Sequence, residues 1–403
     1  MGLPFENQQY TSGGVTGATG PAGPAGATGP TGPAGPAGGT DNLYDLEPNT
    51  TNATKIIDKL GDTFKEVWWS KQRDIITIST NTHGQGTSAF YGGVLAPNGK
   101  VILVPLNSSV VGIYDPDTNT YTNGPTHGQG GNAFYGGVLA PNGKIILIPH
   151  NSANIGIYDP ETNTYSQVTP PHGQGSSAFG GGVLAANGKI IFVPYVGQRV
   201  GIYDPELNTF TAGALHGQPA GGFNGAVLAP NGKVIFTPSA SAVIGIYDPD
   251  LDTYTSGASH GLGAGLGVFQ GGVLAPNGKI IFIPHNSAVI GIYDPILNVY
   301  TSLAHNKGSN ALWVGGVLTT DGKVIFVPFV SGVVGIYDPI ANTYTDGVAH
   351  GRGSVPFFFG VADSKGRAIF VPFRSTYVAI YGRKYQMKPE INNDVLMPYF
   401  NKM

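Results

Sequence analysis

An internal repeat of about 44 residues, present seven times between about residues 83 and 382, constrains this chain more than any other feature. The tag Gly-Ile-Tyr-Asp-Pro marks six copies, and columns of histidine, lysine and aromatic residues keep the same spacing. The tyrosines of the tag are Tyr114, Tyr158, Tyr203, Tyr247, Tyr293 and Tyr337, and a degraded seventh copy ends at Tyr381. A period of about 40–50 residues built from short strands is typical of propeller blades. The sequence therefore predicts an all-β, seven-bladed β-propeller.

The composition narrows the classes of function. Only 11% of the 403 residues are charged and the net charge is −3, without a basic run, so we expect no nucleic-acid partner. The absence of cysteine excludes disulfides, thiolate metal sites and cysteine catalysis. No apolar stretch reaches the roughly 18 residues that indicate a membrane span. The first residues also lack the basic region and apolar core of a secretory signal peptide.

Glycine occupies every third position from Gly14 to Gly38. Only glycine fits at the axis of three intertwined polyproline-II chains, so residues 14–38 predict a collagen-like stalk about 75 Å long at about 3 Å per residue. The alternative is a flexible linker rich in glycine and proline. The run resembles the short collagen-like stalks of viral, phage and bacterial surface fibre proteins, which implies a homotrimer.

Residues 39–73 are expected to form a neck between stalk and propeller. Ile57, Leu60, Phe64 and Val67 are spaced three, four and three residues apart, which predicts a short helix over 53–71. This helix would either join three chains or dock on the propeller. Residues 1–13 are interpreted as an N-terminal anchor peptide and residues 384–403 as a C-terminal tail.

Each repeat is interpreted as four strands separated by turns. In the second copy the turns are Asn-Gly, a strong hairpin signal, and Asp-Pro-Glu-Thr-Asn, in which proline sets φ and the Asp and Asn side chains bond nearby backbone. The glycine pair in the innermost strand suits the crowding of blades at the axis. The strands expected in this copy are Phe134–Leu139, Lys144–Ile148, Ile155–Tyr158 and Thr164–Ser166.

These motifs resemble the kelch repeat. Asn-Gly-Lys recurs at 98–100, 142–144, 187–189, 231–233 and 277–279, and Tyr-Asp-Pro occurs six times. The chain departs from kelch at the end of the second strand, where Pro149-His150-Asn151-Ser152 replaces the double glycine. The resemblance implies a kelch-like propeller over residues 74–383, and it implies no particular activity because fold does not carry function.

Closure of the ring is also predicted. The seventh copy stops after Tyr381, where Asp-Pro is replaced by Gly382-Arg383. Residues 74–80 lie before the first copy, where a fourth strand is missing from the seventh blade. We expect this N-terminal strand to complete the last blade and leave no open sheet edge.

One histidine per copy opens a loop that should lie on the same rim as the loops after the second strands. Metal binding is disfavoured, because metal sites need three or four ligands within a few ångströms. The prediction is that each histidine hydrogen-bonds loop backbone within its own blade; a repeated carbohydrate contact is the alternative. The histidines are His83, His127, His172, His216, His260, His305 and His350.

Residues that break the repeat on this rim are candidates for ligand binding, because the fold does not require them. Arginine beside aromatic rings suits recognition of sugars or carboxylates, and ordinary drift among copies is the alternative. The candidates are Tyr195, Gln198, Arg199, Arg352, Phe373, Arg374 and Tyr377, with the longer loop Gly261–Gly267. No metal, cofactor or catalytic residue is predicted.

Together these features predict a non-enzymatic structural or attachment protein. Three propeller heads on a stalk would bind a host surface glycan or protein receptor, and the N-terminus would anchor the fibre to a virion, phage particle or cell surface. Linking three heads converts weak single contacts into avid attachment. The alternatives are a lectin whose repeated loops each hold a sugar, and an enzyme with a pocket on the rim.

Overall fold

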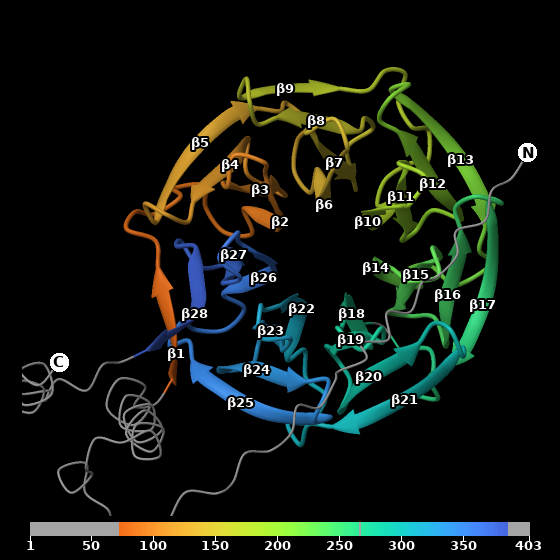
Figure 1. Cartoon of the computed structure of the whole chain (residues 1–403). Coiled ribbons are helices and arrows are strands. Elements are labelled where there is room, and N and C mark those ends of the chain that lie inside the picture. Colours follow the sequence, from red (N-terminus) through yellow and green to blue (C-terminus); the bar gives the residue numbers. More distant parts are fainter. Residues whose placement is uncertain (1–71, 266, 386–403) are drawn as a thin grey trace, which may run out of the picture. The chain divides into compact units, whose positions relative to one another are not determined.

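The computed structural model describes residues 72–265 and 267–385. The anchor peptide, the collagen-like run, the predicted neck helix and nearly all of the tail lie outside these residues. Within them every regular element is a strand, and the strands form seven four-stranded sheets around one axis (Figure 1). All neighbouring strands within a sheet are antiparallel, as in the pairs of β2 with β3 and of β3 with β4 (bounds below).

Each blade has an innermost, a second, a third and an outermost strand, and the strands are grouped here by that position. The innermost strands are β2 (Phe90–Leu95), β6 (Phe134–Leu139), β10 (Phe179–Leu184), β14 (Phe223–Leu228), β18 (Phe269–Leu274), β22 (Trp313–Leu318) and β26 (Phe357–Ala362). The second strands are β3 (Val101–Pro105), β7 (Ile145–Pro149), β11 (Ile190–Pro194), β15 (Val234–Pro238), β19 (Ile280–Pro284), β23 (Val324–Pro328) and β27 (Ala368–Pro372). The third strands are β4 (Val110–Asp115), β8 (Gly156–Asp159), β12 (Arg199–Asp204), β16 (Val243–Asp248), β20 (Val289–Asp294), β24 (Val333–Asp338) and β28 (Ala379–Tyr385). The outermost strands are β5 (Thr120–Thr126), β9 (Thr164–Gln167), β13 (Thr209–Leu215), β17 (Thr253–Ser259), β21 (Val299–Ala304), β25 (Thr343–Ala349) and β1 (Gln72–Ile78).

Blades 1 to 6 are each built from four consecutive strands, beginning with β2–β5. Blade 7 has the order β1-β28-β27-β26, so its outermost strand comes from the N-terminal side of the propeller (Figure 1). The register runs from Gln72 opposite Tyr385 to Ile78 opposite Ala379. The predicted closure by an N-terminal strand is confirmed, but the strand begins and ends two residues earlier than the expected 74–80, so that residues 72 and 73 belong to it and not to the neck.

The core lies between the blades. The second strands are fully buried and apolar except at Thr237 of β15, as in Ile145–Pro149, because both faces of this strand meet a neighbouring blade. Each of the seven blade interfaces has its own apolar cluster. In one of them, Ile102 and Val104 of blade 1 pack with Phe134 and Tyr158 of blade 2. The cluster between blades 7 and 1 closes the ring in the same way as the others.

The Asp-Pro turns between third and outermost strands explain the repeated tag. The Oδ1 atom of Asp115 accepts hydrogen bonds from the backbone N–H groups of Asp117 and Thr118. Asn119 adopts φ 58°, a left-handed conformation that asparagine tolerates. Its Oδ1 accepts a 2.6 Å hydrogen bond from the buried Tyr114 hydroxyl. The tag therefore ties a turn to the core, as its turn chemistry predicts.

The rim that carries these turns also carries hydrogen bonds that join neighbouring blades. In five interfaces the asparagine of the Asn-Gly hairpin donates to the proline carbonyl of the next blade's turn, as Asn98 does to Pro160 over 3.2 Å. Between blades 7 and 1 an arginine takes this place. Arg367 donates from Nη2 to the carbonyl of Pro116 over 2.9 Å.

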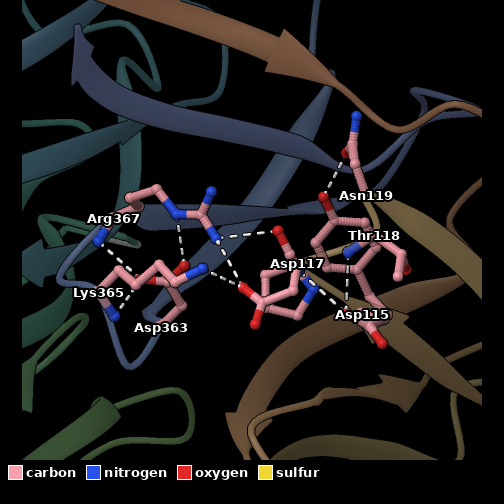
Figure 2. A network of polar contacts seen from close by, with 9 residues as sticks. Asp115, Asp117, Thr118, Asn119, Asp363, Lys365 and Arg367 are labelled. Carbon is pink, nitrogen blue, oxygen red and sulfur yellow. Dashed lines mark hydrogen bonds and ion pairs between the residues drawn. The ribbon is translucent and has the colours of Figure 1, made fainter. Parts of the chain in front are cut away.

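An ion-pair network surrounds this arginine (Figure 2). The fully buried carboxylate of Asp363 accepts from the Arg367 Nε at 2.6 Å and from the backbone N–H groups of Lys365 and Arg367. Lys365 pairs with Asp117 of blade 1, where both side chains are more than half exposed. We call Asp363, Lys365, Arg367 and Asp117 the closing clasp, because they join the last blade to the first.

The innermost strands bulge where they face the axis. Six blades place a glycine with positive φ at this bulge, and blade 7 places Phe359 there with φ 60°. The Phe359 ring lies so close to blade 6 that a Cβ added at Gly315 would clash with its Cδ1. A bulky residue in the left-handed region is strained. Phe359 therefore occupies the central channel, the space along the axis between the innermost strands, at an energetic cost.

Gly315→Ala is expected to destabilise the propeller by about 2–5 kcal/mol, combining left-handed strain of about 1–2 kcal/mol with overpacking of about 1–3 kcal/mol. Gly84→Ala is the matched control, because Gly84 also has positive φ but has no atom within 4 Å of an added Cβ. It should show the strain alone. Urea unfolding of both variants measures the difference, and equal losses would contradict the close contact with Phe359.

Candidate functional site

The sequence-predicted candidates lie at several places on the rim. Tyr195 and Phe373 line one cavity at the axis. The Arg352 guanidinium lies 5.5 Å from the centre of the Tyr377 ring, a cation–π contact.

The remaining candidates belong to neither pair. Arg199 is exposed and donates from Nη1 to the carbonyl of Gly213 within its own blade, over 2.9 Å. Gln198 and Arg374 are exposed, as are residues 261–265 of the longer loop. The structure therefore brings two of the seven predicted residues into a pocket and leaves the others outside it.

The pocket lies at the axis and is called the axial pocket here. Its volume is about 250 Å³. It is lined by Ser88, Tyr91, Leu106, Asn107, Asn132, Tyr135, Tyr195, Asn224, Gln270, Phe358 and Phe373. Below it a second cavity of about 160 Å³ occupies the channel, and Tyr91 and Tyr135 line both. Phe359 and the axial glycines line the lower cavity.

Two columns of the repeat supply most of this lining, and both vary from copy to copy. The first is the residue after the aromatic that opens each innermost strand, namely Tyr91, Tyr135, Gly180, Asn224, Gln270, Val314 and Phe358. The second is the residue after the proline that ends each second strand, namely Leu106, His150, Tyr195, Ser239, His285, Phe329 and Phe373. Sequence reasoning overlooked the first column, although its variation within an otherwise regular repeat was a readable signal.

One side of the axial pocket is aromatic and extends over blades 7, 1, 2 and 3. The rings of Phe358 and Tyr91 are 4.3 Å apart, those of Tyr91 and Tyr135 are stacked at 3.9 Å, and Tyr135 stacks on His150 at 3.5 Å. Tyr195 lies 5.7 Å from His150. Such packed rings form a rigid surface.

The other side carries amide groups from blades 4 and 5. Asn224 is only 4% exposed, and its Nδ2 donates a 3.4 Å hydrogen bond to the Tyr91 hydroxyl. The Oδ1 of Asn224 and the Oε1 of Gln270 are buried and have no hydrogen-bond partner in the protein. Buried polar atoms without a partner cost about 1–3 kcal/mol each, and such exceptions call for an explanation.

The axial pocket has no formal charge. None of its lining residues is Asp, Glu, Lys or Arg. Burial of His150, which stacks behind Tyr135, lowers its pKa and so favours the neutral ring, and its Nδ1 lies 3.0 Å from the carbonyl of Phe179. Across residues 72–265 and 267–385 no group of three or more His, Cys, Asp or Glu side chains could hold a metal ion.

The loop histidines join neighbouring loops on the same rim. The Nε2 of His127 lies 2.7 Å from the carbonyl of Ser108, which belongs to the preceding copy of the repeat, while its Nδ1 accepts from the N–H of Gln129. His83 makes the equivalent bond to Ser375 of blade 7. The expected backbone bonding is confirmed, but its restriction to one blade is wrong, because the ring spans two copies. Both nitrogens are thus occupied.

Acidification is expected to destabilise the propeller through these rings. Burial lowers the pKa of His83, His127, His172, His216 and His305 below 6.5, and this effect outweighs the carbonyl bonds that raise it. The unfolded chain then binds more protons, so the stabilisation is present above the unfolded pKa and is lost as the pH falls below it. The melting temperature should fall between about pH 7.5 and about pH 5, above the carboxylate range near 3.9–4.3. A melting temperature that stays constant over this interval would contradict the assignment.

Comparison with known proteins supports the fold. No known family profile matches the chain, and no curated protein matches its sequence. A streptogramin B lyase structure is similar with a TM-score of 0.65 and 15% identity, covering 79% of this chain and 99% of that one. A catalytically inactive virginiamycin B lyase from Staphylococcus aureus with quinupristin has the same TM-score and identity and covers 77% and 99%. An extracellular domain from B. thetaiotaomicron has a TM-score of 0.61 and 10% identity and covers 78% of this chain and 44% of that one.

At such low sequence identity, these structural similarities support the class of fold, a seven-bladed β-propeller, and nothing finer. In the part of the chain that the structure describes, no helix is long and apolar enough to cross a membrane.

Proposed function

We propose that this chain is a non-enzymatic attachment protein whose propeller recognises a receptor through the axial pocket. The observation that carries the proposal is the uncharged aromatic and amide lining, with two buried acceptors that lack partners. A concave site with a few convergent polar groups is the default location of ligand binding. Because the repeat varies at this pocket while its structural positions recur, the lining serves a purpose other than folding.

We further propose that three such heads are joined by a collagen-like stalk over residues 14–38 and displayed on a virus or phage particle or a cell surface. The support is the strict glycine spacing, since the stalk lies outside the described residues. Light scattering of the full chain and of a chain lacking residues 14–38 tests the trimer. The proposal expects a trimer for the full chain and a weaker assembly for the deletion. A monomer in both would contradict the fibre.

The alternative lectin, with one sugar in each histidine loop, receives less support. His127 and its equivalents are buried and use both ring nitrogens inside the protein. The enzyme alternative draws on the lyases among the structural neighbours. Within the axial pocket, however, the lining offers no carboxylate, lysine or arginine for general acid–base chemistry.

Attachment itself can be measured directly. Fluorescently labelled full-length chain should bind intact cells or particles from its natural surroundings, and Gln270→Ala should reduce that binding while Gln167→Ala, outside the pocket, leaves it unchanged. Detection of the chain in purified particles by mass spectrometry would support its display on a particle. If both substitutions change binding equally, the axial pocket is not the site that recognises the receptor.

A further inference from the structure

We propose that the axial pocket binds one neutral pyranose unit per propeller. The apolar face of the sugar would lie against the aromatic side, and its hydroxyl groups would meet the amides of Asn224 and Gln270. This inference rests on the proposed attachment function, because it names the chemistry of the receptor. It assigns a single site at the axis and none to the seven repeated loops.

The absence of charged residues from the pocket lining favours a neutral ligand. No lysine or arginine among its lining residues could pair with a carboxylate or sulfate, and no acidic residue could pair with an amine. Moving an unpaired charge from water into such a site is costly. A sugar acid is therefore disfavoured relative to the neutral sugar of the same shape.

The unpartnered acceptors select a ligand with hydroxyl groups. Asn224 is 4% exposed and its Oδ1 has no partner, and the same holds for the Oε1 of Gln270, whose side chain is half-buried. A purely apolar ligand would cover both oxygens and leave them unsatisfied. Hydroxyl donors satisfy them, and each amide nitrogen can in turn donate to a hydroxyl oxygen.

The aromatic array selects a ligand that also has an apolar face. Tyr195 and Phe373 stand at opposite ends of the array, and both rings are half-buried, so part of each ring surface is open to a ligand. The C–H groups on one face of a pyranose form a flat apolar surface, while its hydroxyl groups lie around the edge. The pocket has a similar division, with its rings on blades 7, 1, 2 and 3 and the unpartnered amides on blades 4 and 5, and Asn107 and Asn132 add further amides beside the rings of blades 1 and 2.

The size of the pocket limits the ligand to one unit. Its volume of about 250 Å³ is below the ~300–1,000 Å³ typical of sites for drug-sized ligands. Tyr91 and Tyr135 separate it from the channel cavity, which Phe359 partly fills. A terminal sugar can enter from the rim, while the rest of a glycan stays outside.

Calorimetry on the full-length chain tests the ligand class. The probes are the methyl glycosides of glucose, galactose, mannose, fucose and N-acetylglucosamine, with methyl glucuronide as the charged partner of methyl glucoside. We expect at least one neutral glycoside to bind with one site per chain, and the glucuronide to bind at least about tenfold more weakly than the glucoside. Failure of the whole neutral panel, equal binding of the charged partner, or about seven sites per chain would overturn the inference.

Substitutions locate the site. Gln270→Ala and Asn224→Ala should each weaken binding of the best glycoside by about tenfold or more, and Tyr195→Ala should also weaken it. Gln167→Ala is the matched control for Gln270→Ala, because Gln167 is another glutamine, at the end of β9, but does not line the pocket. If Asn224→Ala fails to fold by thermal melting, Gln270→Ala decides. Wild-type affinity in Gln270→Ala would overturn the assignment.

Attachment assays keep the two proposals distinct. If Gln270→Ala abolishes attachment to cells while no glycoside binds, the sugar assignment fails and the attachment function stands. Competition by a peptide fragment of the receptor would then identify a protein ligand. If a neutral glycoside binds at the axis but the chain attaches to no surface, the sugar site stands and the attachment function fails.

Discussion

Removal of β1 is expected to abolish the stability of the whole propeller. This strand supplies seven paired residues to blade 7, and Ile76 packs against the cluster between blades 6 and 7. Loss of several hydrogen bonds at about 0.5–1.5 kcal/mol each, and of half-buried isoleucines that each contribute less than the about 1.5–3 kcal/mol of a fully buried side chain, sums to the order of 5–10 kcal/mol. That loss is comparable with the entire stability of a typical domain, about 5–15 kcal/mol.

The comparison uses two truncated chains. One begins at residue 67, a few residues before β1, and keeps this strand; the other begins at residue 80 and lacks it. The first should unfold cooperatively in urea. The second should show no cooperative transition or should aggregate through the open edge of β28, and a synthetic peptide of residues 72–80 should restore folding. Equal urea midpoints for the two chains would contradict closure by β1.

The second large effect is expected at the closing clasp. Arg367→Ala should lower the free energy of unfolding by about 3–5 kcal/mol, because it leaves the buried carboxylate of Asp363 without its cation. The exposed fraction of the Asp363 side chain is 0%, so water cannot replace the guanidinium without rearrangement. The same substitution removes the hydrogen bond from Arg367 to the carbonyl of Pro116 on blade 1.

Lys365→Ala provides the control within the same interface. Its ion pair with Asp117 is more than half exposed on both sides, so its loss should cost at most about 1 kcal/mol. Urea unfolding of both variants gives the two free energies. A loss of similar size for Lys365→Ala and Arg367→Ala would show that burial of Asp363 does not set the strength of the clasp.

Most of the fold could be predicted from the sequence because the same strand and turn signals recur in seven copies of the repeat. The Asn-Gly and Asp-Pro turns bound each strand, and the missing outer strand of the seventh copy indicated closure by residues near 74. The replacement of the usual Asn-to-Pro bond by Arg367 and Asp363 was not foreseen. It depends on the meeting of blades 7 and 1, which are about 250 residues apart, as the separation of Arg367 from Pro116 shows.

The site was harder to predict than the fold. Tyr195 and Phe373 were found because they break a loop pattern, but Asn224 and Gln270 sit inside strands whose aromatic and glycine neighbours looked structural. Whether a strand position points to the axis depends on the bulge near Gly225 and Gly271, which adopt positive φ. The rim arginines were plausible from chemistry alone, yet Arg199 and Arg352 find partners within the protein, at Gly213 and Tyr377.

The most direct test of the account is a crystal structure of the full chain soaked with the methyl glycoside that binds best in solution. The account predicts electron density for one sugar per propeller, between the Tyr195 and Phe373 rings and the amides of Asn224 and Gln270, inside a ring of seven blades closed by β1. Density in several equivalent histidine loops, or an axial pocket that stays empty while sugar binds elsewhere, would contradict it.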